Sequence, residues 1–204
     1  MATFLLIRHG DNDSLGKYLA GRKPGVHLNE SGIQQAQNLA ERLAHYPIKA
    51  VISSPLERAQ ETAAPIAKSF GLPIEILPAI NEVDFGEWEG KDIEVLRKEP
   101  LWEDVQNRPG QVRFPEGETL QEAQDRIVEA LVALNKRYAK NDLIVCVSHC
   151  DVVRLAVSYF LDISLDNFQR LVISPASITL LSFNDQKPRF ETINYTLDFP
   201  EHHE

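Results

Sequence analysis

Two histidines and two arginines stand where apolar runs end or where helices are expected to begin. Arg8 and His9 directly follow one apolar run, and His149 follows another with a single serine between. Arg58 lies in the first turn of an expected helix. An imidazole nitrogen is a competent nucleophile near neutral pH, and the arginine fork matches phosphate oxygens. These residue types predict a phosphoryl-transfer site in which His9 accepts the phosphoryl group.

Each of these four residues could instead be an ordinary polar residue at the end of a strand. One such position would be unremarkable, but four, with Glu82 as a fifth candidate, favour a common site. An alkoxide leaving group needs a proton, so a carboxylic acid is expected on the far side of the phosphorus, kept protonated by burial beside a phosphate dianion. The neighbouring arginines would favour neutral His9, and a backbone carbonyl would hold its attacking tautomer where Gly10 permits an unusual turn.

Apolar periodicity predicts the elements that position these side chains. Near-continuous apolar runs are typical of buried strands, and apolar residues three or four apart indicate amphipathic helices. Strands are expected at 3–7, 48–52, 74–77 and 142–147, with a hairpin of 178–183 and 189–197 through 184–188. Helices are expected at 29–43, 55–70, 91–99, 118–138, 151–160 and 165–170. This alternation predicts an α/β fold, a three-layer αβα sandwich with a mainly parallel central sheet.

The start of the second helix carries a charge in an unusual place. Ser54 is expected to cap this helix, with Pro55 at its first position. Arg58 then lies near a helix amino end, which is already positive and therefore disfavours a cation. The position becomes favourable if an anion binds there.

Residues 1–204 are expected to form a single domain. The long polar loop 11–28 leaves from the strand end that carries His9, so we expect it to face the substrate. Residues 80–117 are expected to be an insertion that covers the site as a cap. Within this cap, residues 100–117 hold three prolines and two glycines and are predicted to be irregular.

The composition limits the partners and the location. The 204 residues carry a formal net charge of −9, which argues against nucleic acid as the partner. No apolar run approaches the roughly 18 residues of a transmembrane helix, and the first apolar run lacks the basic flank of a signal peptide. A cytoplasmic protein that binds no membrane is expected. Cys146 and Cys150 match no usual zinc or redox spacing, and His202 and His203 are expected to be solvated.

Four segments together resemble the histidine phosphatase superfamily, also called phosphoglycerate mutase-like. They occur in the family's order across nearly the whole chain, at residues 8–10, 53–59, 82–90 and 147–149. The resemblance implies the phosphoglycerate mutase-like fold and an enzyme that forms a phosphohistidine intermediate.

The resemblance also implies roles for particular residues. His9 would carry the phosphoryl group, and Glu82 would be the proton donor. The phosphate pocket would be formed by Arg8, Arg58 and His149. Three other carboxyls of the same loop compete with Glu82 for the proton-donor role, first Asp84 and then Glu87 and Glu89.

The loop after His9 departs from the family pattern. Asn12 and Leu15 stand where other residues are usual, so the hydrogen bonds to substrate are expected to differ. Cys150 replaces a glycine usual after the second histidine and would narrow the room near the phosphate. Arg22 could hold a second anionic group or could be a solvated loop cation. The residues expected to bind substrate in addition to the phosphate pocket are Asn12, Leu15, Gly21 and Arg22.

The resemblance leaves a phosphatase and a mutase to be distinguished. Segments 19–28, 166–170 and 174–177 look like those of a bacterial subgroup labelled "probable phosphomutase", a label that says little about substrate. Cofactor-dependent phosphoglycerate mutases carry a longer, arginine-rich cap that excludes water, whereas residues 87–117 are short and acidic on balance. We therefore expect a phosphatase for a small phosphorylated metabolite, with no cofactor and no metal, and with a homodimer left open. The alternatives are a phosphomutase, a protein phosphohistidine phosphatase and a non-catalytic protein that binds phosphorylated ligands.

Overall fold

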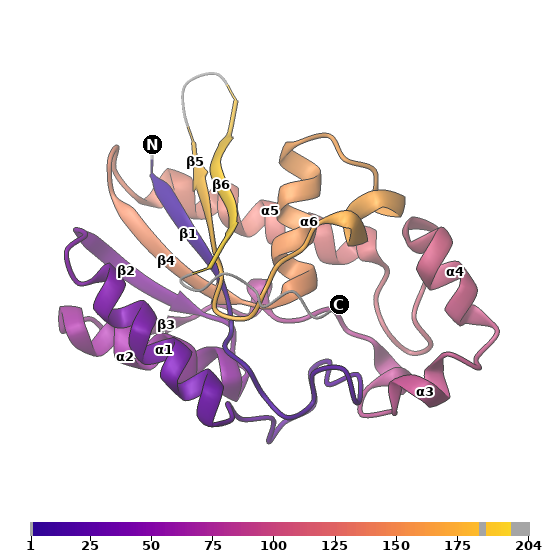
Figure 1. The fold of residues 1–204 in the computed structure, drawn as a ribbon. Helices are drawn as coiled ribbons and strands as arrows, with labels where there is room; N and C mark the ends of the chain where they lie inside the picture. Colours follow the sequence, from indigo (N-terminus) through magenta and orange to yellow (C-terminus); the bar gives the residue numbers. More distant parts are fainter. Residues whose placement is uncertain (1, 184–186, 197–204) are drawn as a thin grey trace.

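The computed structural model describes residues 2–183 and 187–196 and has a mixed α/β fold around one six-stranded sheet (Figure 1). The strands are β1 (Thr3–Arg8), β2 (Ile48–Ser53), β3 (Ile74–Ile76), β4 (Leu143–Ser148), β5 (Ile178–Ser182) and β6 (Arg189–Tyr195). Their spatial order is β3-β2-β4-β1-β5-β6. The first four in this order pair in parallel, and β5 and β6 add antiparallel pairs.

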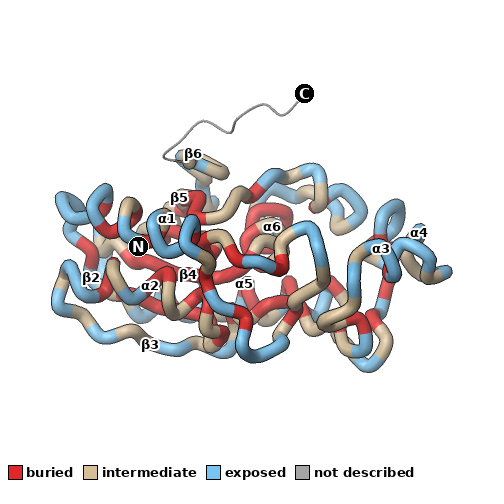
Figure 2. The backbone as a smooth tube through the Cα atoms, turned by 60° about the horizontal axis from the view of Figure 1, so that its bottom comes forward, coloured by how far each residue is buried: buried red, intermediate tan, exposed pale blue. Residues whose placement is uncertain are grey.

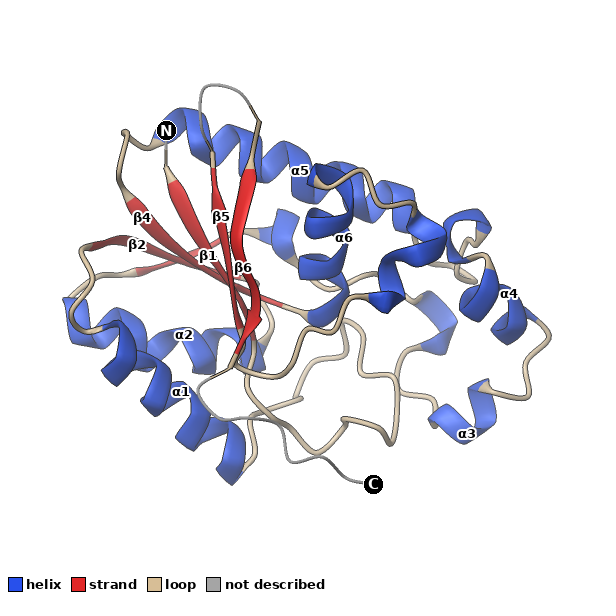
Figure 3. Ribbon diagram, turned by 45° about the horizontal axis from the view of Figure 1, so that its top comes forward, coloured by secondary structure: helices blue, strands red, loops and turns tan. Residues whose placement is uncertain are grey.

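Helices cover both faces of the sheet (Figure 3). They are α1 (Glu30–Leu43), α2 (Glu57–Phe70), α3 (Ile93–Leu96), α4 (Leu101–Asn107), α5 (Leu120–Arg137) and α6 (Cys150–Phe160). Helices α1 and α2 share one apolar cluster with Leu5, Ile7 and Val145 of the sheet. Helices α5 and α6 share the other cluster with Phe4 and Cys146. The predicted three-layer sandwich with a mainly parallel sheet is confirmed.

The central strands β1 and β4 bring the two predicted histidines together. Most of their residues are apolar and buried, as expected for strands covered on both faces (Figure 2). In their parallel register Arg8 lies opposite Ser148, and the His9 N–H donates to the Ser148 carbonyl at 2.9 Å. His9 and His149 therefore leave adjacent strands at the same edge of the sheet.

The start of α2 differs from the prediction. The helix begins at Glu57 after Leu56, which makes no side-chain cap, so Pro55 is not its first residue. The Ser54 hydroxyl lies 2.7 Å from His149 Nε2 and accepts the Leu56 N–H at 3.4 Å, so it contacts both the site and the residue before α2.

Part of the cap is more regular than its composition predicts. Residues 101–107 form α4, although the surrounding segment is rich in proline and glycine. Val105 of this helix is buried, and Trp102 stacks on Trp88 with ring centroids 6.1 Å apart. Burial of these side chains against the α5–α6 cluster stabilises a helix that local sequence disfavours.

The remaining boundaries shift by a few residues. The helix predicted at 91–99 is only the short α3. The helix predicted at 118–138 begins at Leu120, after Thr119, which forms a capping box with Glu122. The turn predicted at 184–188 includes residues 184–186, which lie outside the described residues, as do the terminal histidines. No helix in the described part of the chain is both long and apolar enough to span a bilayer.

Candidate active site

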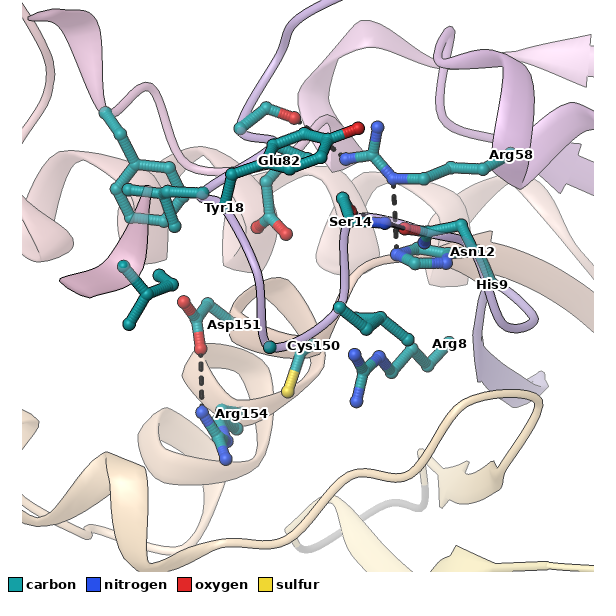
Figure 4. A pocket seen from close by; sticks show the side chains of 17 residues that line it. Arg8, His9, Asn12, Ser14, Tyr18, Arg58, Glu82, Cys150, Asp151 and Arg154 are labelled. Atoms are coloured by element: carbon teal, nitrogen blue, oxygen red, sulfur yellow. Dashed lines mark hydrogen bonds and ion pairs between the residues drawn. The ribbon is translucent and has the colours of Figure 1, made fainter. Parts of the chain in front are cut away.

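A pocket of about 220 Å³ lies beside the carboxyl ends of β1 and β4 (Figure 4). Side chains line it from the end of β1, from the loop after it, from α2, from the loop after β3 and from α6. The predicted site residues in this lining are Arg8, His9, Asn12, Leu15, Gly21, Arg58 and Glu82. Two predicted residues, Arg22 and His149, are not part of the lining.

His9 is 4% exposed, and its two ring nitrogens differ in environment. Nδ1 lies 2.8 Å from the Gly10 carbonyl oxygen, which can only accept, so we assign the proton to Nδ1. Nε2 is then unprotonated, and it accepts a hydrogen bond from Arg58 Nε at 3.3 Å. Burial, and then the charges of Arg58 and Arg8, hold the pKa of His9 well below its usual range. The ring is a neutral imidazole with its lone pair on Nε2.

Gly10 is required for space rather than for an unusual turn. The φ angle of Gly10 is not positive, so the unusual turn expected from the sequence does not occur. A Cβ at this position would lie 2.8 Å from the Gly32 carbonyl oxygen of α1. The Gly10 N–H donates to Thr62 Oγ1 of α2 at 3.0 Å. These contacts hold the peptide whose carbonyl orients the His9 ring.

Arg8 and Arg58 reach the same end of the pocket from β1 and α2. Arg8 Nη1 donates to the Ile173 carbonyl at 2.6 Å, and Arg58 Nη2 donates to the Gly21 carbonyl at 2.8 Å. Both guanidinium groups are thus anchored, yet Arg8 Nε and Arg58 Nη1 are buried without a partner. Because an unpaired buried donor is costly, two such donors beside His9 form a site suited to an oxyanion.

His149 lies fully buried at the end of β4, with its ring centroid 5.2 Å from that of His9. Its Nε2 contacts Ser54 Oγ, and its Nδ1 has no hydrogen-bond partner. Burial, and then the charge of Arg58, holds the pKa of His149 well below its usual range. His149 Nδ1 also lies 4.0 Å from Glu82 Oε2, so this ring sits next to both the His9 ring and the Glu82 carboxyl.

Glu82 supplies a buried carboxyl to the pocket. Burial, and after it the negative charge of Asp151, raise its pKa to about 7. Glu82 Oε1 accepts the Val83 N–H at 2.9 Å, which fixes the orientation of the carboxyl. A carboxyl with a pKa near neutrality can give up a proton in one step and take one back in the next.

Two guanidinium groups hold the backbone of Glu82. Arg22 Nε and Arg126 Nη2 both donate to the Glu82 carbonyl, at 2.8 and 3.0 Å. Arg126 Nη1 also donates to two further carbonyls of the same loop. Glu118 Oε1 accepts from Arg22 at 3.1 Å and from Arg126 at 2.6 Å. We call Arg22, Arg126 and Glu118 the arginine clamp, because together they fix the loop that carries the carboxyl.

The rival carboxyls of this loop point elsewhere. Asp84 pairs with Arg22 at 3.0 Å, and Glu89 Oε1 accepts the Arg22 N–H at 2.9 Å. Glu87 is exposed. Of the four carboxyls considered from sequence, Glu82 is the one in the pocket lining.

The residues predicted to contact substrate divide into two groups. Asn12 Oδ1 accepts from both the N–H and the hydroxyl of Ser14, which leaves the buried Asn12 Nδ2 without a partner at the pocket. Leu15 adds an apolar surface, and Gly21 contributes the carbonyl that anchors Arg58. Arg22 is committed to the arginine clamp and to Asp84, so its guanidinium is not directed into the pocket.

Sequence reasoning missed several lining residues. Asp151 and Arg154 lie one helical turn apart on α6 and both line the pocket, as do Ser14 and Tyr18. Asp151 and Arg154 are three residues apart in the helix predicted to follow His149. This spacing puts both side chains on one face of the helix and could have indicated them. Cys150 does edge the pocket as expected, and burial raises the pKa of its thiol to about 11.

The side chains collected here suit phosphoryl transfer. That reaction requires positioning and charge stabilisation more than covalent work by protein groups. A neutral imidazole, unpaired arginine donors and a carboxyl that titrates near neutrality meet these needs. Among residues 2–183 and 187–196, no group of three or more His, Cys, Asp or Glu side chains could hold a metal ion.

Comparison with known proteins identifies the class to which this fold and site belong. The chain matches the family model of the histidine phosphatase superfamily, branch 1, over residues 4–196, and it belongs to that superfamily. The resemblance proposed from sequence is therefore confirmed.

Individual relatives include phosphatases and a mutase. The chain is 30% identical over 202 residues to phosphoserine phosphatase 1 of Hydrogenobacter thermophilus, covering 96% of this chain and 93% of that protein. It is 30% identical over 183 residues to the 2,3-bisphosphoglycerate-dependent phosphoglycerate mutase of Thermoplasma acidophilum, covering 89% and 87%. A mutant phosphoserine phosphatase of Entamoeba histolytica, solved with phosphoserine, matches with a TM-score of 0.85 and 26% identity, covering 95% and 97%.

Proposed function

We propose that the protein is a phosphatase that hydrolyses a small phosphomonoester through a phosphohistidine intermediate at His9. The observation that carries this proposal is the unprotonated His9 Nε2 beside buried, unpartnered donors of Arg8 and Arg58. An ester phosphate bound by these donors would have its phosphorus next to the His9 lone pair. His149 Nδ1 and Asn12 Nδ2 are further unpaired groups that could bind phosphate oxygens.

In the first step His9 Nε2 attacks the phosphorus, and the bond from phosphorus to the ester oxygen breaks. The electron pair of that bond leaves with the oxygen, which takes the proton of the Glu82 carboxyl. The alcohol departs, and the phosphoryl group remains on His9. Arg8 and Arg58 stabilise the charge on the phosphoryl oxygens, which is where most of the catalytic effect is expected.

In the second step a water molecule attacks the phosphorus of phosphohistidine. The Glu82 carboxylate takes a proton from that water, the bond from nitrogen to phosphorus breaks, and inorganic phosphate leaves. His9 and protonated Glu82 are restored. The Glu82 pKa of about 7 supports both of these roles at neutral pH. Residues of the chain supply the nucleophile, the acid and the charges, so the proposal includes no cofactor.

The cap supports hydrolysis over mutase activity. A mutase must hold a second anionic group of its substrate while it excludes water. The cap arginines are directed elsewhere: Arg97 pairs with Glu94, Arg108 pairs with Asp104, and Arg113 is exposed and pairs with α5. Of the described cap residues, only Glu82, Phe85 and Ile93 line the pocket. Because one relative is a phosphoglycerate mutase, phosphomutase activity is the second candidate function.

Three broader statements belong to the same proposal. Residues 1–204 would act as one domain, with residues 80–117 as the cap over the site. The partner would be a small phosphorylated metabolite, for which a pocket of about 220 Å³ is a suitable size. It remains a prediction that the protein is cytoplasmic and contacts neither nucleic acid nor membranes. A homodimer is also left open.

A paired assay tests the proposal. One arm follows phosphate release from a panel of phosphomonoesters, and the other follows conversion of 3-phosphoglycerate to 2-phosphoglycerate with 2,3-bisphosphoglycerate added. Release without isomerisation is expected, whereas isomerisation at a comparable rate would identify a mutase. Rapid quenching in base should also trap a base-stable, acid-labile phosphoryl group on the protein. Binding without turnover would identify a non-catalytic phospholigand-binding protein.

A further inference from the structure

The pocket has two chemically distinct ends. The phosphate end consists of Arg8, His9 and Arg58, and the leaving-group end consists of Asp151 and Arg154 on α6. Figure 4 shows these two α6 side chains on the side of the pocket away from His9 and Arg58, with Cys150 between them and Arg8. Neither residue of the leaving-group end has a role in the reaction proposed above, although Asp151 influences Glu82.

The leaving-group end is a preorganised ion pair. Arg154 Nη1 donates to Asp151 Oδ1 at 3.0 Å, and Arg154 Nε donates to the Leu171 carbonyl at 2.7 Å. These two bonds fix the guanidinium plane. Arg154 Nη2 and Asp151 Oδ2 take no part in these two bonds, and the two side chains are 22% and 23% exposed. The pair therefore presents an unused donor and an unused acceptor next to each other at the pocket.

The charges of the pocket restrict which alcohol suits this end. Arg8 and Arg58 balance a phosphate dianion, and Glu82 is uncharged in its acid form. The Asp151–Arg154 pair then adds one charge of each sign. An alcohol that carries only a carboxylate meets repulsion from Asp151, and one that carries only an ammonium group meets repulsion from Arg154. An alcohol that carries both groups can satisfy both residues.

We propose that Asp151 and Arg154 bind the leaving alcohol of a zwitterionic phosphomonoester, with the substrate ammonium on Asp151 and the substrate carboxylate on Arg154. A phosphorylated hydroxy amino acid is the simplest member of this class. The volume of about 220 Å³ suits a molecule of that size. This inference rests on the proposed phosphatase function, because it concerns the same pocket.

The test compares four esters that differ in these two groups. Phosphoserine carries both groups, phosphoethanolamine only the ammonium, 3-phosphoglycerate only the carboxylate, and glycerol 3-phosphate neither. We expect kcat/KM to be highest for phosphoserine, by about tenfold to a hundredfold over glycerol 3-phosphate, as for paired hydrogen bonds to charged groups. Similar values for all four esters, or a preference for an ester with a single charged group, would overturn the inference.

Variants assign the preference to the two residues. Asp151→Asn should reduce the preference for phosphoserine over 3-phosphoglycerate by about tenfold or more, and Arg154→Lys should reduce its preference over phosphoethanolamine. Each comparison uses a ratio of two alkyl esters in one variant, so any general effect on catalysis cancels. Asp125→Asn, which removes the same charge from an exposed position on α5, is the matched control. Unchanged ratios in both α6 variants would contradict the assignment.

Binding separates this inference from the proposed function. The His9→Ala protein should bind phosphoserine more tightly than glycerol 3-phosphate in calorimetry, and addition of Asp151→Asn should remove that difference. This ranking needs no turnover. A protein that ranks the esters as expected but releases no phosphate would refute the phosphatase proposal alone. Turnover without any ranking would refute only the role of the ion pair.

Discussion

His9 and Glu82, the nucleophile and the proton donor of the proposed reaction, are positioned in different ways. His9 directly follows the buried strand β1. Its backbone N–H bonds to β4 and sets its place, and its ring Nδ1 contacts the Gly10 carbonyl, which sets its tautomer. Glu82 lies on a loop, and the side chains of the arginine clamp hold its backbone from α5 and from the loop after β1. The nucleophile therefore depends on the sheet, whereas the acid depends on a few distant polar side chains. Substitutions outside the pocket should impair proton donation more readily than nucleophilic attack.

The largest effect is expected from His9→Ala. Loss of the attacking nitrogen should lower kcat by about a thousandfold or more for every ester, including nitrophenyl phosphate. Phosphate release is the measurement, with circular dichroism to verify the fold. His27→Ala, which alters an exposed histidine paired with Glu61, is the matched control. Residual activity above about a hundredth of the wild-type value would remove His9 from the nucleophile role.

Glu82→Gln should affect esters according to their leaving groups. Without an acid, kcat for alkyl phosphates should fall by about a hundredfold to ten-thousandfold. Nitrophenolate needs little protonation, so nitrophenyl phosphate should be affected much less. Glu87→Gln, an exposed residue of the same loop, should leave both substrates unchanged. Equal loss for both substrates in Glu82→Gln would reassign the proton donor.

Arg126→Gln examines the arginine clamp directly. Removal of this guanidinium breaks hydrogen bonds to three loop carbonyls and leaves the Glu82 carbonyl with Arg22 as its remaining donor, so the Glu82 carboxyl should be held less firmly. We expect kcat for alkyl phosphates to fall by about tenfold, with a smaller change for nitrophenyl phosphate, because misplacement of a catalytic group is costly. Arg113 is exposed and pairs with Glu122 of α5, the helix that carries Arg126. Arg113→Gln therefore controls for the loss of a positive charge. A clamp variant that slows both substrates equally would argue that the nucleophile is disturbed too.

The pH profile of the proton donor should respond to Asp151. Glu82 acts as an acid in its protonated form, so kcat/KM for an alkyl phosphate should decline as the pH rises through about 7. The negative charge of Asp151 helps to raise this pKa, and Asp151→Asn should therefore lower it and move the decline to lower pH. The profile with nitrophenyl phosphate serves as the reference. A decline that stays in place or moves to higher pH would contradict this account of the Glu82 pKa.

The smallest effect is expected from a chelator. The proposed steps use only side chains of the chain, so EDTA should change kcat by less than about twofold. Loss of activity in EDTA that returns with added Mg²⁺ or Zn²⁺ would show that a metal ion takes part.

Most of the phosphate end could be predicted from the sequence. The apolar runs before His9 and His149 predict central strands, and parallel strands bring their carboxyl ends to one edge. Arg58 was found because a cation in the first turn of a helix is unfavourable without an anion. The cap was harder to predict, since α4 forms through burial of Trp102 and Val105 in spite of the local proline and glycine.

The chain's own pattern was sufficient to predict the sandwich, to place His9 and His149 at strand ends and to propose His9 as the nucleophile, because hydrophobic periodicity and strand ends are local properties. The choice of Glu82 over Asp84, and the use of Arg22 in the clamp rather than for substrate, required the folded molecule. The position of the Asp151–Arg154 ion pair at the pocket was also found only in the folded molecule. These outcomes depend on which side chains meet across distant segments and on how deeply each is buried, and burial determines both the pKa of a carboxyl and the freedom of a guanidinium to bind a ligand.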